Sequence, residues 1–190
     1  MRDNQDILQQ YVSDMISLDK HILEAIERQL NDDRIDAYTG ARTVITSIKT
    51  AITSQNSALE QQLESVGGEA SAPIKETLSA IAGVAAGLYD KVRHDPVSKM
   101  LRDDYTALSL ASIGYTMLHT TGLALKHDGV ANVALSALKE LAPIVVKISE
   151  TIPGIVIQDL KEEEVTIAPE VKDQAVKNTQ EAWSGENVGK

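Results

Sequence analysis

Few residues of this chain could take part in chemistry, and the best placed of them is His119. It follows Tyr115 by four residues, which puts both side chains on one face of a helix. Such a histidine acts as a metal ligand when a carboxylate or a second histidine faces it. It has a structural role when its ring instead forms a hydrogen bond with a hydroxyl or carbonyl group. Because threonines are abundant around it, we expect His119 to be structural.

The segment that holds this pair, residues 106–125, runs twenty residues without a formal charge in a chain that is 24% charged. A membrane-spanning helix needs about 20 predominantly apolar residues. The serines and threonines of this segment, together with His119, would be costly in lipid. We therefore expect no membrane insertion, and instead a helix of a soluble bundle that is surrounded by protein on all sides.

The sequence contains no established catalytic motif. There is no Gly-x-Ser-x-Gly, no phosphate-binding loop and no dinucleotide fingerprint. The glycines of residues 83–88 resemble a nucleotide loop only in composition, because no strand is predicted before them and no Lys-Ser/Thr pair follows. The chain has no Cys, which excludes disulfides, thiolate catalysis and thiolate metal sites.

The net negative charge of the chain disfavours negatively charged partners. The chain has 28 acidic and 18 basic residues, a formal net charge of −10, and no run of Lys or Arg. Nucleic acid and anionic membrane surfaces both attract clustered positive charge, so we expect neither as a partner. The N-terminus has no apolar signal segment, and we expect a cytoplasmic protein.

Apolar residues recur at three- and four-residue steps along most of the chain, which predicts an all-α protein. A length of 190 residues is enough for one domain with a sizeable core. With no Phe, five Tyr and one Trp, that core must consist mainly of Ile, Leu, Val, Ala and Met. The predicted helices cover residues 4–30, 36–66, 71–92, 98–126 and 130–149.

Helix-stopping residues separate these helices. The polar triplet 31–33 predicts a short turn, so the first two helices should form an antiparallel hairpin. Pro143 lies inside the fifth helix and should kink it, and residues 151–154 should end it. In the third helix, Gly83 and Gly87 form a G-x-x-x-G spacing that favours close packing in a soluble protein. Apolar residues on more than one face of that helix predict a homodimer.

The chain changes character near residue 160. We expect a helical bundle over residues 1–160 and a polar, acidic, flexible tail over residues 161–190. Ala175, Val176, Thr179 and Trp183 could form one or two amphipathic turns within the tail. Such turns would anchor the tail on the bundle or on a protein partner.

Several short segments match one known family, and they span about residues 5–158. They are Tyr11-Val12-Ser13-Asp14-Met15 and Leu18-Asp19-Lys20 in the first predicted helix, Leu59-Glu60-Gln61-Gln62-Leu63 and Gly67-Gly68 in the second, Tyr115 in the fourth, and Leu138-Lys139-Glu140 in the fifth. On these residues the chain resembles the bacterial stress-induced ferritin-like family. The resemblance implies a ferritin-like bundle of two antiparallel helical hairpins, with an extra connecting helix.

The resemblance also implies a di-metal site, with carboxylates in the first and last helices and Glu and His ligands in the second and fourth. Only Asp19 and Glu140 keep a carboxylate, as vestiges of such a site. Gln55 and its neighbours replace the ligands of the second helix, Gly114 lies near the expected His, and Glu-x-x-His occurs nowhere. Two metal ions need several carboxylates to balance their charge. We therefore expect no metal and no cofactor.

The favoured interpretation is a non-catalytic ferritin-like protein that has lost its metal site and acts as a stress-related structural or interaction protein. Two alternatives stay open. One is a ferritin-like di-metal oxidoreductase or iron-handling protein with an unusual site built from Asp19, Glu140, His119 and Tyr115. The other is a carrier of a small apolar ligand in the bundle core, with Gln55, Tyr115 and His119 as the candidate pocket residues.

Overall fold

The computed structural model describes residues 3–68 and 96–184, and all the regular structure in these residues is helical. The helices are α1 (Asn4–Leu30), the 3-10 helix η1 (Asp33–Ala37), α2 (Thr39–Ser65), α4 (Val97–Ala124), α5 (Asp128–Glu162) and α6 (Val171–Ser184). The all-α prediction is confirmed for this part of the chain. The third predicted helix, with Gly83 and Gly87, lies outside the described residues.

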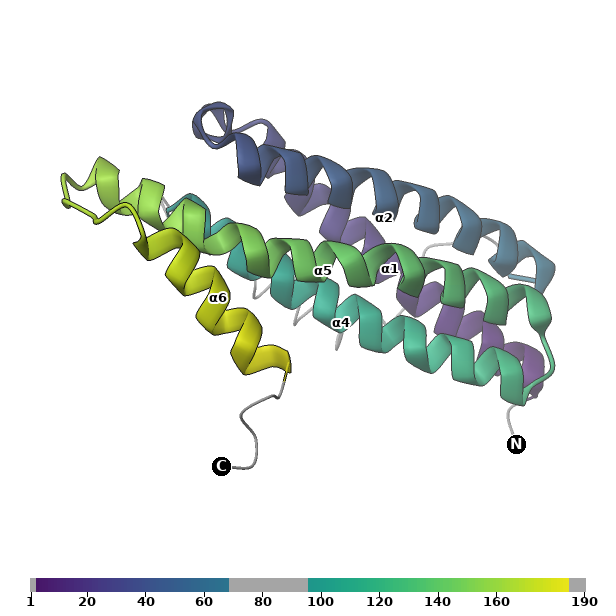
Figure 1. Ribbon diagram of the computed structural model, residues 1–190. Coiled ribbons are helices and arrows are strands. Elements are labelled where there is room, and N and C mark those ends of the chain that lie inside the picture. The colour runs from purple at the N-terminus through teal and green to yellow at the C-terminus, as the bar shows by residue number, and fades with distance from the viewer. Residues whose placement is uncertain (1–2, 69–95, 185–190) are drawn as a thin grey trace.

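The four long helices form a bundle in which α1 packs on α2, α2 on α5, α5 on α4, and α4 on α1 (Figure 1). Neighbouring helices run antiparallel. Asp19 bonds Tyr115 while Gln29 bonds Asp104, so numbers rise along α1 as they fall along α4. Along α2 and α5, too, residue numbers rise on one helix as they fall on the other, so this pair is also antiparallel. Consequently α2 and α4 run in the same direction, and the end of α2 lies at the opposite end of the bundle from the start of α4.

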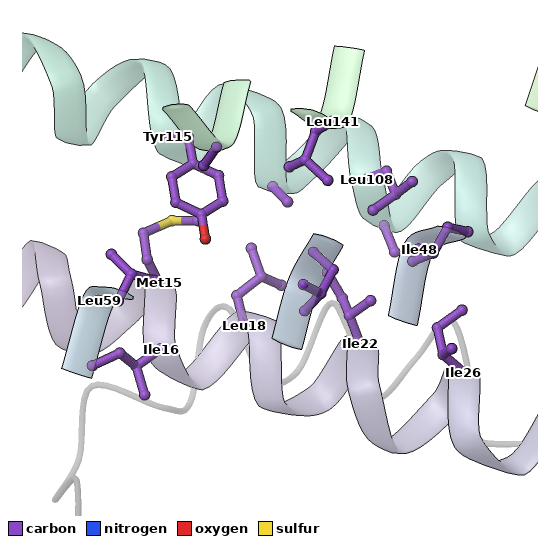
Figure 2. Packing of buried hydrophobic residues seen from close by; sticks show 14 of the residues in the cluster. Met15, Ile16, Leu18, Ile22, Ile26, Ile48, Leu59, Leu108, Tyr115 and Leu141 are labelled. Atoms are coloured by element: carbon purple, nitrogen blue, oxygen red, sulfur yellow. The ribbon is translucent and has the colours of Figure 1, made fainter. Parts of the chain in front are cut away.

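The core of the bundle is aliphatic, as the composition predicts. Isoleucine, leucine, valine and alanine side chains from all four long helices fill it, and Tyr38 and Tyr115 are the buried aromatic residues among those described. Figure 2 shows Ile22 and Ile26 of α1 beside side chains of the facing helices. Burying one such side chain stabilises the fold by about 1.5–3 kcal/mol, so the apolar faces of the helices hold the bundle together.

The turn between α1 and α2 is built by Asp32. Its carboxylate accepts a hydrogen bond from the backbone N–H of Arg34 and pairs with the guanidinium of the same residue. This side-chain cap starts η1, which carries the chain across to α2. The predicted hairpin is confirmed. The second helix begins at Thr39, slightly later than predicted, because η1 occupies the residues before it.

The predicted end of the fifth helix is wrong. α5 continues through Pro153 to Glu162. A proline inside a helix removes one backbone hydrogen bond and introduces strain. Here the last third of the helix is fixed by contacts with other elements. Ile155 is buried in the core, and the Tyr38 hydroxyl donates a 2.8 Å hydrogen bond to the carboxylate of Asp159. These tertiary contacts outweigh the local stop signal.

Tyr38→Phe should therefore loosen the far end of α5. The substitution removes one part-buried hydrogen bond, which costs about 0.5–1.5 kcal/mol of unfolding free energy. Hydrogen exchange should quicken for the amides of residues 155–162, while the amides of residues 130–141 serve as an internal control. Unchanged exchange in residues 155–162 would mean that the bond does not hold the helix end in place.

The expectation that protein surrounds residues 106–125 on all sides is also wrong. The inner face of α4 is buried, but Ile113, Met117 and Leu123 are 62%, 50% and 57% exposed. The uncharged stretch is therefore apolar on both its core face and its outer face. An exposed apolar helix face of this kind is more typical of an interaction surface than of a solvated one.

One helix in the described part of the chain, α5, is long and apolar enough by length and composition to cross a membrane. Core helices of water-soluble bundles meet the same two criteria. In this structure α5 packs on α4, α2 and α6.

Residues 171–184 form helix α6, which is longer than the one or two amphipathic turns expected. α6 contacts α5 and reaches α4 through Trp183, whose ring lies edge-on to that of Tyr105 at a centroid distance of 5.8 Å. The aliphatic part of Lys172 lies against Gly154 of α5. α6 contributes no fully buried residue, so it covers the bundle only loosely. The division into domains at residue 160 stays a prediction.

Candidate functional site

Four residues, one from each long helix, form a polar layer at mid-height in the bundle. They are Asp19 of α1, Gln55 of α2, Tyr115 of α4 and Glu140 of α5, and we call them the central layer. Tyr115 bonds Asp19, and Gln55 bonds Glu140 at 3.4 Å. The charge of Glu140 also acts on Tyr115. The sequence singled out each of these residues, and the fold brings all four together.

Asp19 is sealed inside the protein, with an exposed fraction of 0%. The hydroxyl of Tyr115 donates to its Oδ2 atom at 2.5 Å, whereas its Oδ1 atom is buried with no hydrogen-bond partner among the described residues. Two lysines of α1 and α2 do not reach this carboxyl. Lys20 pairs with Glu60, and Lys49 pairs with Glu27, both at the surface.

Burial raises the pKa of Asp19 from 3.8 to about 7, although the hydrogen bond from Tyr115 opposes the shift. Desolvation disfavours the charged form of a carboxyl group. Burial therefore shifts Asp19 toward its neutral form at neutral pH. A neutral carboxylic acid is a poor metal ligand, because metals bind the deprotonated form.

Tyr115 joins α4 to α1. Figure 2 shows its ring pointing from α4 toward Met15 and Leu18. The side chain is fully buried, and burial is the largest cause that raises the pKa of its phenol. The charge of Asp19, the hydrogen bond to it and the charge of Glu140 raise that pKa further. Tyr115 is therefore a neutral donor throughout the physiological range and does not supply a phenolate.

Glu140 lies at the edge of the central layer, where the bundle meets solvent. Its carboxylate accepts from Gln55 and lines a shallow surface cavity of about 560 Å³ together with residues of α2 and α5. The Oε1 atom of Gln55 is buried and has no hydrogen-bond partner in the part of the chain that the structure describes. The two carboxyl groups of the layer therefore occupy different environments, because Asp19 is buried and Glu140 is exposed to solvent.

His119 lies one helical turn beyond Tyr115 on α4, half-buried. Its Nδ1 atom is 2.8 Å from the carbonyl oxygen of Ala131 on α5, which makes the Nδ1–H tautomer the donor. A carbonyl is one of the two kinds of partner expected of a structural histidine, and the role of His119 stays a prediction. The same place is where α4 and α5 approach closely, since a Cβ atom at Gly122 would lie 2.7 Å from the backbone nitrogen of Ala131.

A second buried polar pair was not predicted from the sequence. The side-chain amide of Gln29 donates to Oδ1 of Asp104 at 2.8 Å, and both residues are buried between α1 and α4. Spacing could have revealed it, because Asp104 belongs to the core stripe of α4. That stripe recurs at four- and three-residue steps through Asp104, Leu108, Ala111, Tyr115 and Leu118.

The central layer does not fit a di-metal centre. Within residues 3–68 and 96–184, no group of three or more His, Asp or Glu side chains is placed to hold a metal ion. Of the two carboxylates in the layer, Asp19 is sealed, and burial shifts it toward its neutral form. Tyr115 occupies the space beside it with a hydroxyl and an aromatic ring. These groups do not supply the charge that two metal ions require.

The geometry also limits other chemistry in the layer. Asp19 and Tyr115 have no exposed surface, so no substrate can reach either group without opening the bundle. A buried acid bonded to a phenol fixes the register between α1 and α4, and its ionisation makes stability depend on pH.

Comparison of the chain with protein-family models, with curated proteins and with solved structures found no match in any of the three.

Proposed function

We propose that this protein is a ferritin-like bundle without a di-metal centre, which acts in the cytoplasm as a stress-related structural or interaction protein. The arrangement of the helices supports the ferritin-like part of the proposal. Two antiparallel pairs, α1 with α2 and α4 with α5, are joined so that α2 and α4 point the same way. Ferritin-like bundles have this connectivity, with one long crossover between their hairpins.

The observation that carries the non-catalytic part is the content of the central layer. In a ferritin-like bundle, each helix projects a metal ligand toward the middle. Here the corresponding side chains are a sealed carboxyl, an amide, a phenol and one carboxylate at the solvent edge. Aliphatic residues fill the space above and below them. A core of this content stabilises the fold and leaves the outer faces of the helices to perform the function.

The outer face of α4 is the surface that favours association. Ile113 and Met117 lie along it and are at least half exposed. Interface centres are depleted in charge and enriched in apolar side chains, including Met. We propose that the protein forms a homodimer and that this face contributes to it.

Two measurements on one preparation test the proposal. Purified protein should hold far less than one iron, manganese or zinc per chain, and light scattering should give twice the mass of the chain. Ile113→Lys should lower that mass to the monomer value, because a cation would be buried without a partner. Thr43→Lys makes a similar change on the exposed face of α2 and should leave the dimer intact.

The absence of a metal centre and the homodimer are contradicted by different outcomes. A reproducible pair of metal ions per chain, lost on Glu140→Gln, would favour the oxidoreductase alternative and refute the absence of a metal centre. A monomer at every concentration tested would refute the dimer. A dimer that tolerates Ile113→Lys as well as Thr43→Lys would show that another surface forms the contact.

A further inference from the structure

We infer that the cleft between α5 and α6 binds a small protonated amine with an apolar body. The cleft has a volume of about 460 Å³, and residues of α4, α5 and α6 line it. Small-molecule sites have volumes of roughly 300–1,000 Å³ and are mainly apolar, with a few polar groups that orient the ligand. The inference concerns a different surface from the proposed function, and the two can fail separately.

Apolar and aromatic side chains form the walls of the cleft. Val146 and Ile152 belong to α5, Tyr105 to α4 and Trp183 to α6. The rings of Tyr105 and Trp183 meet edge to face, with an interplanar angle of 68°, which leaves Trp183 60% exposed. An exposed tryptophan beside a second aromatic ring offers a π face to a ligand, and π faces attract cations as well as apolar groups.

The polar groups of the cleft select the charge of the ligand. Among the described residues that line it, Glu150 is the one charged side chain, and none is Lys, Arg or His. The Oε1 atom of Glu150 accepts from Gln180 at 3.4 Å, and its Oε2 atom lies 3.5 Å from Lys147, an exposed pair of little strength. The carboxylate therefore retains most of its attraction for a cation and repels an anion.

The backbone carbonyl of Ser149 is a second acceptor, because Pro153 follows it by four residues. Proline has no N–H, so the helical hydrogen bond to the carbonyl of Ser149 is missing, and both residues line the cleft. A carboxylate and a helix carbonyl that lacks its usual donor both favour a ligand with several N–H donors. A primary ammonium group has three of them. The apolar walls and the two aromatic rings then accommodate the rest of the molecule.

The single tryptophan of the chain provides a direct readout. Its indole N–H gives one NMR signal, which can be followed while phenethylamine, 2-phenylethanol or 3-phenylpropionate is added to the full-length protein. These three molecules share a phenyl body and differ in charge. We expect a saturable shift with the amine, binding about fivefold or more weaker for the alcohol, and no saturable shift for the carboxylate.

Variants then locate the site. Glu150→Gln keeps an acceptor for Gln180 and should reduce amine binding to the level of the alcohol. Val146→Lys should abolish amine binding, while Val156→Lys, on the same helix outside the cleft, should not. Equal shifts with all three ligands, no saturable shift with the amine, or amine binding unaffected by Glu150→Gln would each overturn the inference.

Discussion

Asp19→Asn should stabilise the protein relative to wild type at pH 8, and this relative gain should shrink as the pH falls. Burial raises the pKa of Asp19 in the folded state to about 7, above its value of 3.8 in the absence of burial. The folded state therefore binds the proton more tightly. The stability that the group contributes is fully present below pH 3.8 and is lost as the pH rises through 7. Asparagine does not titrate and escapes this loss.

The difference in unfolding free energy between Asp19→Asn and wild type is less informative at any one pH than its change with pH. The asparagine side chain would bury an amide N–H in place of one carboxyl oxygen, and a buried donor without a partner costs about 1–3 kcal/mol at every pH. The difference between variant and wild type should still grow by about 2–3 kcal/mol from pH 5 to pH 8. Other groups with raised pKa values, such as Asp14, are common to both proteins and cancel.

Denaturant unfolding of both proteins between pH 5 and pH 8 measures the effect. Asp173→Asn removes a negative charge from the exposed first turn of α6 and controls for the change in net charge. A pH-independent difference between Asp19→Asn and wild type would mean that Asp19 is ionised in the fold over this whole range. Such a carboxylate would need a cation or other donors beside Tyr115, which would reopen the question of a metal.

Gly122→Ala should destabilise the bundle, whereas Gly114→Ala, on the same helix, should leave its stability unchanged or slightly raised. A Cβ atom at Gly122 would lie 2.7 Å from the nitrogen and 2.9 Å from the Cα atom of Ala131. Both are backbone atoms of α5, so the two helices would have to separate. Overpacking of this kind typically costs about 1–3 kcal/mol.

Gly114 differs in what a new methyl group would meet. The nearest atom is the sulfur of Met15, the end of a flexible side chain that can move aside. Alanine is also favoured over glycine within a helix by up to about 1 kcal/mol. The two variants therefore make the same chemical change on one helix with opposite expected signs.

Denaturant midpoints of the two variants test this difference, and the ring signals of His119 report on the same contact. In Gly122→Ala the hydrogen bond between His119 and the Ala131 carbonyl should weaken, because the helices move apart. Equal midpoints for the two variants would show that α4 and α5 can separate at little cost. The close approach would then not be what fixes the α4–α5 pair.

Helix positions near strong local signals were predicted well from the sequence. The start and end of α1 and the start of α4 follow from apolar periodicity and from polar or proline residues at the breaks. These signals act between residues close in the chain, so they can be read without a fold. The end of α5 could not be predicted in this way, because Tyr38 and Ile155 hold it through contacts made across the bundle.

The residues of the central layer could be predicted from the sequence, but their hydrogen bonds and pKa values could not. The family resemblance selected Asp19 and Glu140 as remaining carboxylates and Gln55 as a replaced ligand, and Tyr115 was selected on the resemblance and on its spacing to His119. Which donor Asp19 obtains depends on the packing of α4 against α1. The lysines near it in sequence or on the next helix point to the surface and pair there instead. The pKa of a carboxyl follows from such surroundings and not from its neighbours in the chain.

By itself the sequence determined that the chain is all-helical, that its core is aliphatic and that known catalytic motifs are absent, because composition and periodicity express these properties directly. Only the tertiary structure decided that Asp19 is sealed with Tyr115, that the outer face of α4 is left exposed, and that α6 closes a cleft over α5. Each of these depends on which helix faces which, and helix order and rotation arise from side-chain packing between segments distant in sequence.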